Sequence, residues 1–309
     1  MTRRPAHRLL ALAGAAALTV SLAACGSDDD GDEATTDDTA TEDAADEADS
    51  DATGSGDFPE GSTMAELAAA GEVTVGTKFD QPGFGLLNPA TNEPEGFDVE
   101  VAKIIADELG IAEDGISWVE TVSANREPFI QEGRVDYVVA TYTINDDRKE
   151  VIDFAGPYYQ AGQDIMVAAG NPLGIAGPDD FTGTTTCSVE GSTPAEYVRT
   201  NYPDAEITLF DVYSKCSEAL KNGQVDSVTT DNVILLGIIA QDPESFELVD
   251  NPFTEEPYGI GVTKGDDDFR SFIIDGLEAA FEDGRWAQAW DDTAGEFADT
   301  PEAPAVARY

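Results

Sequence analysis

The chain has little histidine, cysteine and positive charge. Its 309 residues include one His and three Cys, and 16 Lys and Arg stand against 63 Asp and Glu, which gives a formal net charge of −47. Nucleic-acid binding is excluded, because that affinity depends on Lys and Arg that neutralise phosphates. The only His is His7, near the N-terminus, so His-based acid–base catalysis and His-ligated metal sites are not expected in the body of the chain.

The N-terminal apolar run is too short for a comfortable membrane crossing. It extends from Leu9 to Leu22 after three arginines, and a spanning helix needs about 20 apolar residues. The run ends in Leu22-Ala23-Ala24-Cys25, the pattern of a bacterial lipoprotein signal. We therefore expect a signal peptide over residues 1–24 and a lipid anchor on Cys25, which would hold the protein on the extracytoplasmic face of the cell membrane. The alternative is an ordinary secretory signal with an incidental Cys.

An acidic segment follows the signal. Between Asp28 and Asp57 there are 14 Asp and Glu and no Lys or Arg, and the first aromatic residue after it is Phe58. Such a composition cannot bury enough apolar surface to offset the entropy lost on ordering. Residues 25–57 are therefore predicted to be a disordered tether that its like charges extend. An acidic interaction tail with its own partner is the alternative.

Helix and strand patterns alternate after the tether. Ser62 and Gly71 have the positions of a cap and a stop for a first helix, and the residues 72–77 alternate as a strand. Asp98 is expected to cap a second helix, and a second strand is expected over 116–119. This order predicts an α/β fold with mostly parallel strands.

One pattern of residues occurs twice. The segments from Phe129 to Thr141 and from Ala219 to Asp231 each comprise a helix that ends at a Gly, the pair Val-Asp, a strand and then a polar residue eight positions after the Gly. Ligands of open α/β sheets bind beyond the carboxyl ends of the strands. We therefore expect two lobes that present Thr141 and Asp231 to a shared cleft. The alternative is a common packing unit without functional meaning.

Three cations stand just after predicted strands. Only 13 Lys and Arg follow the leader, and Lys78, Arg126 and Arg148 are among them. The stretch that holds Thr141, Thr143 and Arg148 combines hydroxyl donors, a helix start and a guanidinium, which together suit a carboxylate. A cationic pocket in an acidic shell is predicted. Arg148 could instead be an exposed helix residue paired with a neighbouring Asp.

The second half of the chain offers further candidates. Ser192 and Thr193 follow a predicted strand and can either cap a helix or donate to an anion. Asp231 is the natural acceptor for an ammonium group, unless it only caps the helix after it.

Two cysteines remain once Cys25 is assigned to lipid. An exported chain occupies an oxidising space, so Cys187 and Cys216 are expected to form a disulfide, which would stabilise by about 3–4 kcal/mol for a loop of about 30 residues. Free thiols or a zinc site are the alternatives. No metal or cofactor is expected.

The motifs together resemble the amino-acid solute-binding proteins of ABC importers, family 3, and within them the glutamate-binding lipoproteins of Gram-positive bacteria. The resemblance extends from about Glu72 to Trp290. It is carried by Phe79-Asp80-Gln81-Pro82-Gly83, Gly96-Phe97-Asp98-Val99-Glu100, Ser123-Ala124-Asn125-Arg126-Glu127, Gly133-Arg134-Val135-Asp136, Ala140-Thr141-Tyr142-Thr143-Ile144, Val151-Ile152-Asp153-Phe154 after Arg148, Pro157-Tyr158, the run from Cys187 to Pro194, and Asp231.

The resemblance implies the two-lobed periplasmic-binding-protein-like fold of type II, with two hinge crossings and the ligand in the interlobe cleft. Residues 58–160 and 259–309 would form lobe 1, and 161–258 would form lobe 2. The lobes would close around the ligand by a hinge.

The resemblance also implies roles for the candidate residues. Arg148 would clamp the α-carboxylate of an amino acid, helped by Thr143, the backbone near Thr141, and the Ser192-Thr193 turn. Asp231 would accept the α-ammonium group. Arg126, helped by Lys78, would hold a side-chain carboxylate.

The implied function is that of a monomeric binding protein without enzymatic activity. It would capture glutamate and deliver it to the permease and ATPase complex of an ABC importer. Aspartate, glutamine and cystine are alternative ligands, and a dehydratase-type enzyme is the alternative from another class.

Overall fold

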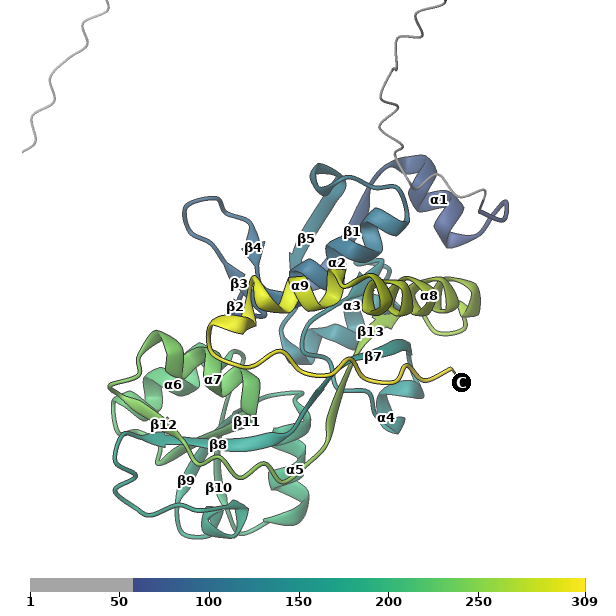
Figure 1. The fold of residues 1–309 in the computed structure, drawn as a ribbon. Helices are drawn as coiled ribbons and strands as arrows, with labels where there is room; N and C mark the ends of the chain where they lie inside the picture. Colours follow the sequence, from purple (N-terminus) through teal and green to yellow (C-terminus); the bar gives the residue numbers. More distant parts are fainter. Residues whose placement is uncertain (1–57, 309) are drawn as a thin grey trace, which may run out of the picture. The chain divides into compact units, whose positions relative to one another are not determined.

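The structure is a computed structural model that describes residues 58–308 (Figure 1). The expected signal peptide, the lipidation site Cys25 and the acidic tether lie outside the described residues. Within residues 58–308, no helix combines the length and apolar character that crossing a membrane requires.

The first five-stranded sheet is the centre of lobe 1. Its strands are β1 (Val73–Thr77), β5 (Ile116–Glu120), β6 (Tyr137–Val138), β7 (Asp153–Ala161) and β13 (Glu256–Val262). They lie in the order β5-β1-β6-β13-β7. The pairs β1–β5 and β1–β6 are parallel, as expected, whereas β13 is antiparallel to both β6 and β7 because the chain returns to this sheet from lobe 2.

Six helices and a small sheet complete lobe 1. The helices are α1 (Thr63–Ala70), α2 (Phe97–Glu108), α3 (Arg126–Gln131), α4 (Asp146–Lys149), α8 (Asp267–Asp283) and α9 (Arg285–Asp291). The small sheet contains β2 (Asp80–Gln81), β3 (Gly85–Leu87) and β4 (Pro94–Glu95).

The second five-stranded sheet is the centre of lobe 2. Its strands are β8 (Gln163–Ala168), β9 (Thr185–Val189), β10 (Glu206–Phe210), β11 (Ser227–Asp231) and β12 (Phe246–Leu248), in the order β10-β9-β11-β8-β12. Its helices are α5 (Thr193–Asn201), α6 (Tyr213–Lys221) and α7 (Asn232–Gln241). Strand β9 pairs in parallel with β10 and β11, whereas β8 is antiparallel to β11 and β12.

The chain passes between the lobes twice. It crosses at Gly162, between β7 and β8, and returns between β12 and β13 (Figure 1). The predicted two-lobed α/β fold with two crossings is confirmed. The strand ends that follow the repeated segments therefore meet at the junction of the two lobes.

Aromatic side chains from distant parts of the chain pack together in the core of lobe 1. Phe97 of α2 lies edge-on to Trp290 of α9, with ring centroids 5.0 Å apart, and Tyr159 of β7 stacks on Trp290 at 4.9 Å. Each fully buried large apolar side chain contributes about 1.5–3 kcal/mol. The C-terminal helices α8 and α9, which meet at Gly284, are therefore part of the core.

Several local predictions are confirmed. The Ser62 side chain accepts from the Ala65 amide at the start of α1, and Gly71 ends that helix with a left-handed backbone. The two repeated segments also turn at glycines of left-handed conformation, with φ 63° at Gly133 and φ 66° at Gly223. Both copies then lead into buried strands.

The prediction that Asp98 caps α2 is wrong. The first two amides of this helix, those of Phe97 and Asp98, donate to the carbonyl oxygens of Gly83 and Phe84 at 2.8 and 3.0 Å. The backbone of the β2–β3 turn thus provides the cap. Asp98 falls inside the first turn, where it is buried and its carboxylate is free to bind elsewhere.

Candidate functional site

The two polar residues that end the repeated segments line one cavity. Thr141 of lobe 1 and Asp231 of lobe 2 both contribute to this narrow space between the lobes. Four other predicted site residues line the same cavity, namely Arg126, Thr143, Ser192 and Thr193. Lys78 and Arg148 lie behind this lining, where they contact residues that form it or adjoin it.

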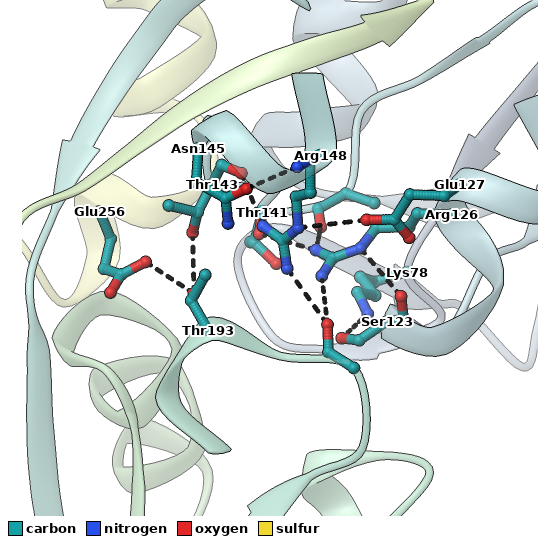
Figure 2. A network of polar contacts seen from close by, with 12 residues as sticks. Lys78, Ser123, Arg126, Glu127, Thr141, Thr143, Asn145, Arg148, Thr193 and Glu256 are labelled. Carbon is teal, nitrogen blue, oxygen red and sulfur yellow. Dashed lines mark hydrogen bonds and ion pairs between the residues drawn. The ribbon is translucent and has the colours of Figure 1, made fainter. Parts of the chain in front are cut away.

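Arg148 is held on the inner side of α4. Its Nη1 donates to the Thr143 carbonyl at 2.6 Å and its Nη2 to the Gly191 carbonyl of lobe 2 at 3.1 Å (Figure 2). Its Nε pairs with Glu127 at 3.1 Å. The alternative of an exposed residue paired with Asp146 or Asp147 is wrong, because Asn145 caps α4 and the Arg148 side chain turns inward, with 8% of its surface exposed.

Arg126 lies beside Arg148 at the start of α3. Its guanidinium donates to four backbone carbonyls, those of Ser123, Ala140, Thr141 and Gly191, at 3.2–3.3 Å. The Tyr142 ring lies under both guanidiniums, with its centroid 4.2 Å from the Arg126 Cζ and 5.0 Å from that of Arg148. Burial, with Arg126 beside it, lowers the pKa of Arg148 to about 10. Apart from the Glu127 carboxylate, the acceptors of the two guanidinium groups are neutral backbone carbonyls. Most of the positive charge of Arg126 and Arg148 therefore remains available to an anion.

Lys78 brings a third cation to this region. Its Nζ donates to the Ser123 hydroxyl at 2.9 Å, and 3% of the residue is exposed. No Asp or Glu within residues 58–308 forms an ion pair with it. Burial first, and then Arg126, lowers the pKa of Lys78 to about 7, while Asp80 and Asp98 act in the opposite direction. A buried ammonium supported by one hydroxyl is poised to gain from an added carboxylate.

Asp231 supplies a carboxyl group from lobe 2. Its Oδ2 accepts from the Tyr258 hydroxyl at 2.5 Å, and its Oδ1 is buried without a hydrogen-bond partner. Burial first, and then Glu256, raises the pKa of Asp231 to about 8. Asp231 occupies the N-cap position of α7, but its side chain makes no capping bond, so the alternative of a plain helix cap is not supported. An unpaired buried carboxylate oxygen is costly, which suits it to a cationic partner.

Threonines join the lobes on another side of the cavity. The Thr193 hydroxyl donates to Glu256 at 2.7 Å and lies 3.3 Å from the Thr143 hydroxyl. Ser192 caps α5, because its Oγ accepts from the Ala195 amide at 3.1 Å while donating to the Val189 carbonyl at 2.7 Å. The helix-cap role considered for the Ser192-Thr193 turn is thus confirmed for Ser192.

Asp98 is a site residue that the sequence analysis missed. Its Oδ2 accepts from the Thr141 amide and its Oδ1 from the Tyr158 hydroxyl, both at 2.7 Å. Thr141 has a φ of 43°, which is unfavourable for a residue with a branched side chain. Asp98 thereby fixes the backbone whose carbonyl receives Arg126. Burial raises the pKa of Asp98 to about 7.

Other missed residues line the cavity or contact the predicted ones. They are Gln81, Ser123, Glu127, Tyr142, Tyr213, Thr230, Glu256 and Tyr258. Four of them, Gln81, Ser123, Glu127 and Tyr142, stand inside quoted motifs, so their position beside expected site residues was the available signal.

The expected disulfide is present. Cys187 of β9 is joined to Cys216 of α6, with an S–S distance of 2.04 Å. It lies behind the Gly191 turn, because β9 ends at Val189. The bridge therefore ties the strand that leads into the site to a neighbouring helix of the same lobe.

Residues 73–292 match the family of bacterial extracellular solute-binding proteins, family 3. The chain belongs to this family. Membership in this family agrees with the buried polar cavity between the two lobes.

Named relatives of this chain bind amino acids. It is 40% identical over 253 residues to the glutamate-binding protein GluB of Corynebacterium efficiens, covering 79% of this chain and 86% of that one. It is 36% identical over 228 residues to the glutamine-binding protein GlnH of Bacillus subtilis, covering 74% and 83%. Among solved structures, a solute receptor for L-cysteine from Neisseria gonorrhoeae matches with a TM-score of 0.72 and 28% identity, covering 76% of this chain and 95% of that one.

Proposed function

We propose that this solute-binding protein captures L-glutamate outside the cytoplasmic membrane and delivers it to the permease and ATPase complex of an ABC importer. The names of its relatives support an amino-acid ligand of an ABC transporter. The charges of the site support the choice of glutamate.

The observation that carries the proposal is the arrangement of cations in lobe 1. An α-amino acid needs one cationic partner for its carboxylate and one anionic partner for its ammonium group, and Arg148 and Asp231 match these needs. Arg126 and Lys78 remain, both buried and without a carboxylate partner among the described residues. Two further cations suit a ligand with a second carboxylate.

The hydrogen bonds agree with this assignment. Arg126 and Arg148 both donate to the Gly191 carbonyl, a single neutral acceptor that the two guanidiniums share. Carboxylates bind guanidinium groups with shorter and stronger hydrogen bonds than neutral carbonyls do. In the proposed complex Arg148 takes the α-carboxylate and Arg126, with Lys78, takes the γ-carboxylate. The Thr141, Thr143 and Thr193 groups complete the donor set, beside the Ser192 turn.

Titration calorimetry of the chain from residue 25, with Cys25→Ser to prevent lipidation, tests the ligand. We expect glutamate to bind at least about tenfold more tightly than glutamine, because a hydrogen bond to a charged group contributes about 1.5–3 kcal/mol. Aspartate and cystine complete the panel. Tighter binding of glutamine, aspartate or cystine would show that the side-chain assignment is wrong.

We also propose that the protein is a lipid-anchored monomer that binds its ligand without changing it. Cells that carry Cys25→Ser should release the protein into the medium, whereas the unchanged chain should remain in the membrane fraction. Recovery of glutamate unaltered after prolonged incubation with the protein is expected, and appearance of a product would favour an enzyme.

A further inference from the structure

Helix α6 of lobe 2 begins without a capping side chain of its own. Val212 occupies its N-cap position, no side chain of the adjoining residues caps it, and its first turn has no acidic residue. The first amides of a helix have no partner within the helix, and a valine cannot accept from them. Helix α5 of the same lobe shows the ordinary solution, with Ser192 as its cap.

The acceptor for α6 comes from lobe 1. Asp80, in β2, accepts with Oδ2 from the Tyr213 amide at 2.9 Å and from the Ser214 amide at 3.3 Å. A carboxylate at this place also interacts favourably with the positive end of the helix dipole. Asp80 is therefore the N-cap of a helix that belongs to the other lobe.

The contact is part of a wider surface between the lobes. The turn after β2 packs on α7, because a Cβ added at Gly237 would lie 2.3 Å from the Pro82 carbonyl oxygen. Figure 1 shows β2 facing α6 and α7, and contacts join β2 to both helices. Asp80 does not line the ligand cavity.

We propose that Asp80 is a positioning residue for ligand capture, which caps α6 only when the lobes are closed and thereby stabilises the closed form. The inference rests on the proposed function, since it assumes that the lobes open to admit a ligand. When they open, Asp80 and the amides of α6 separate. The α6 amides then lose the acceptor that lobe 2 itself does not provide.

The Asp80 cap should contribute the same free energy to the binding of every ligand that closes the lobes. Asp80→Ala is expected to weaken the binding of glutamate and of glutamine by the same factor, about tenfold. This factor corresponds to about 1.4 kcal/mol, which is typical for removal of an N-cap. The ratio of the two affinities should remain unchanged. Calorimetry with both amino acids should show the weaker binding, and stopped-flow measurement of dissociation should show faster release of both ligands.

Val212→Ser separates this role from a merely structural one. A serine at this position caps α6 in the open and the closed form alike, so closure gains less from Asp80. The variant should melt at a higher temperature without ligand but bind glutamate about threefold more weakly, and adding Asp80→Ala should weaken binding only to the roughly tenfold loss of Asp80→Ala alone. Under a merely structural role, Val212→Ser would instead restore the affinity lost in Asp80→Ala.

Asp211→Ala is the matched control. Asp211 precedes the same helix, but it is exposed and pairs with Lys215 of its own lobe. Its removal should change glutamate affinity by less than twofold. An equally small effect of Asp80→Ala, or unequal effects on the two amino acids, would overturn the inference.

Failure of the proposed function can be distinguished from failure of the inference about Asp80. In that case the unchanged protein binds neither glutamate nor glutamine. A screen of the other amino acids then supplies a ligand that closes the lobes, and in that complex Asp80→Ala should speed hydrogen exchange at the Tyr213 and Ser214 amides. Equal exchange at these amides in the two ligand-bound proteins would overturn the inference.

Discussion

Tyr258 donates a hydrogen bond of 2.5 Å to Asp231 and so joins a returning strand of lobe 1 to the end of a lobe 2 strand. Tyr258 is fully buried among the aromatic residues of lobe 1. One carboxylate oxygen of Asp231 is thus held by the other lobe, and the second, Oδ1, is buried without a hydrogen-bond partner, so in the proposed complex it is the oxygen that accepts from the ligand ammonium.

Asp231→Asn should abolish amino-acid binding and raise the thermal stability of the ligand-free protein at pH 8. A carboxyl whose folded pKa is raised, here from 3.8 to about 8, contributes stability below its unfolded pKa and loses it as pH rises toward the folded pKa. The Asn variant lacks this loss. We expect its Tm to exceed that of the unchanged protein by about 2–6 °C at pH 8 and by less at pH 5.

Scanning fluorimetry at the two pH values measures this difference. Asp98 also has a raised pKa, so the unchanged protein has a second group with the same sign, and only the difference between the proteins reports Asp231. A difference in Tm that does not grow between pH 5 and pH 8 would contradict the prediction.

Arg148→Ala should weaken binding of both glutamate and glutamine by about 100-fold or more, because both present an α-carboxylate. Arg126→Ala should weaken glutamate by about 30-fold and glutamine by less than threefold. Arg134→Ala is the control, since Arg134 is exposed and lies over the Phe129 ring. Calorimetry with the two ligands measures these losses of affinity. Equal losses for glutamate and glutamine in Arg126→Ala would show that Arg126 does not hold the side-chain carboxylate.

The preference for glutamate over glutamine should fall between pH 6 and pH 9. The pKa of Lys78 is about 7, so its ammonium loses charge as pH rises through this range, and glutamate loses a partner that glutamine does not need. Both ligands meet the same Asp231, so its titration cancels in the ratio of their affinities. Asp98, with a pKa of about 7, gains negative charge over the same range and acts in the same direction.

The variant Lys78→Met identifies the part of this pH dependence that Lys78 contributes. Its affinity ratio should be lower at pH 6 than that of the unchanged protein and should depend less on pH. A ratio that stays constant from pH 6 to pH 9 in the unchanged protein would argue against a charged Lys78 at the ligand.

Removing the disulfide with Cys187→Ser and Cys216→Ser together should cost about 3–4 kcal/mol, given the separation of 29 residues. The expected fall in Tm is about 10 °C. Melting the unchanged protein with and without a reductant gives an independent measure. Because the bridge lies within lobe 2, the ratio of glutamate to glutamine affinity should remain unchanged, and a large shift in it would assign the bridge a role in the site.

The sequence allowed prediction of those parts of the site that local patterns determine. Thr141 and Asp231 could be placed in one cleft because each follows a buried strand after the same helix turn, and strand ends define where ligands bind. Cys187 and Cys216 could be paired from their number and context. Arg126 and Arg148 stood out because cations are few.

The partners of these residues could not be predicted, because tertiary packing determines them. Asp98 looked like a helix cap, but backbone carbonyls of a hairpin already satisfy the helix start, so its carboxylate binds Thr141. Tyr258 reaches Asp231 only because its strand returns from lobe 2. No local pattern shows that Val212 leaves α6 to be capped from the other lobe.

The insertion of β13 between β6 and β7 dictates an order of assembly. Strands β8 to β12 of lobe 2 come from one continuous stretch of the chain, whereas the lobe 1 sheet is complete only after β13, and its core only after α9. As the chain is made from its N-terminus, lobe 2 has all of its strands while lobe 1 still lacks β13, the strand that joins β7 to the rest of its sheet. The first lobe to begin is therefore the last to be finished.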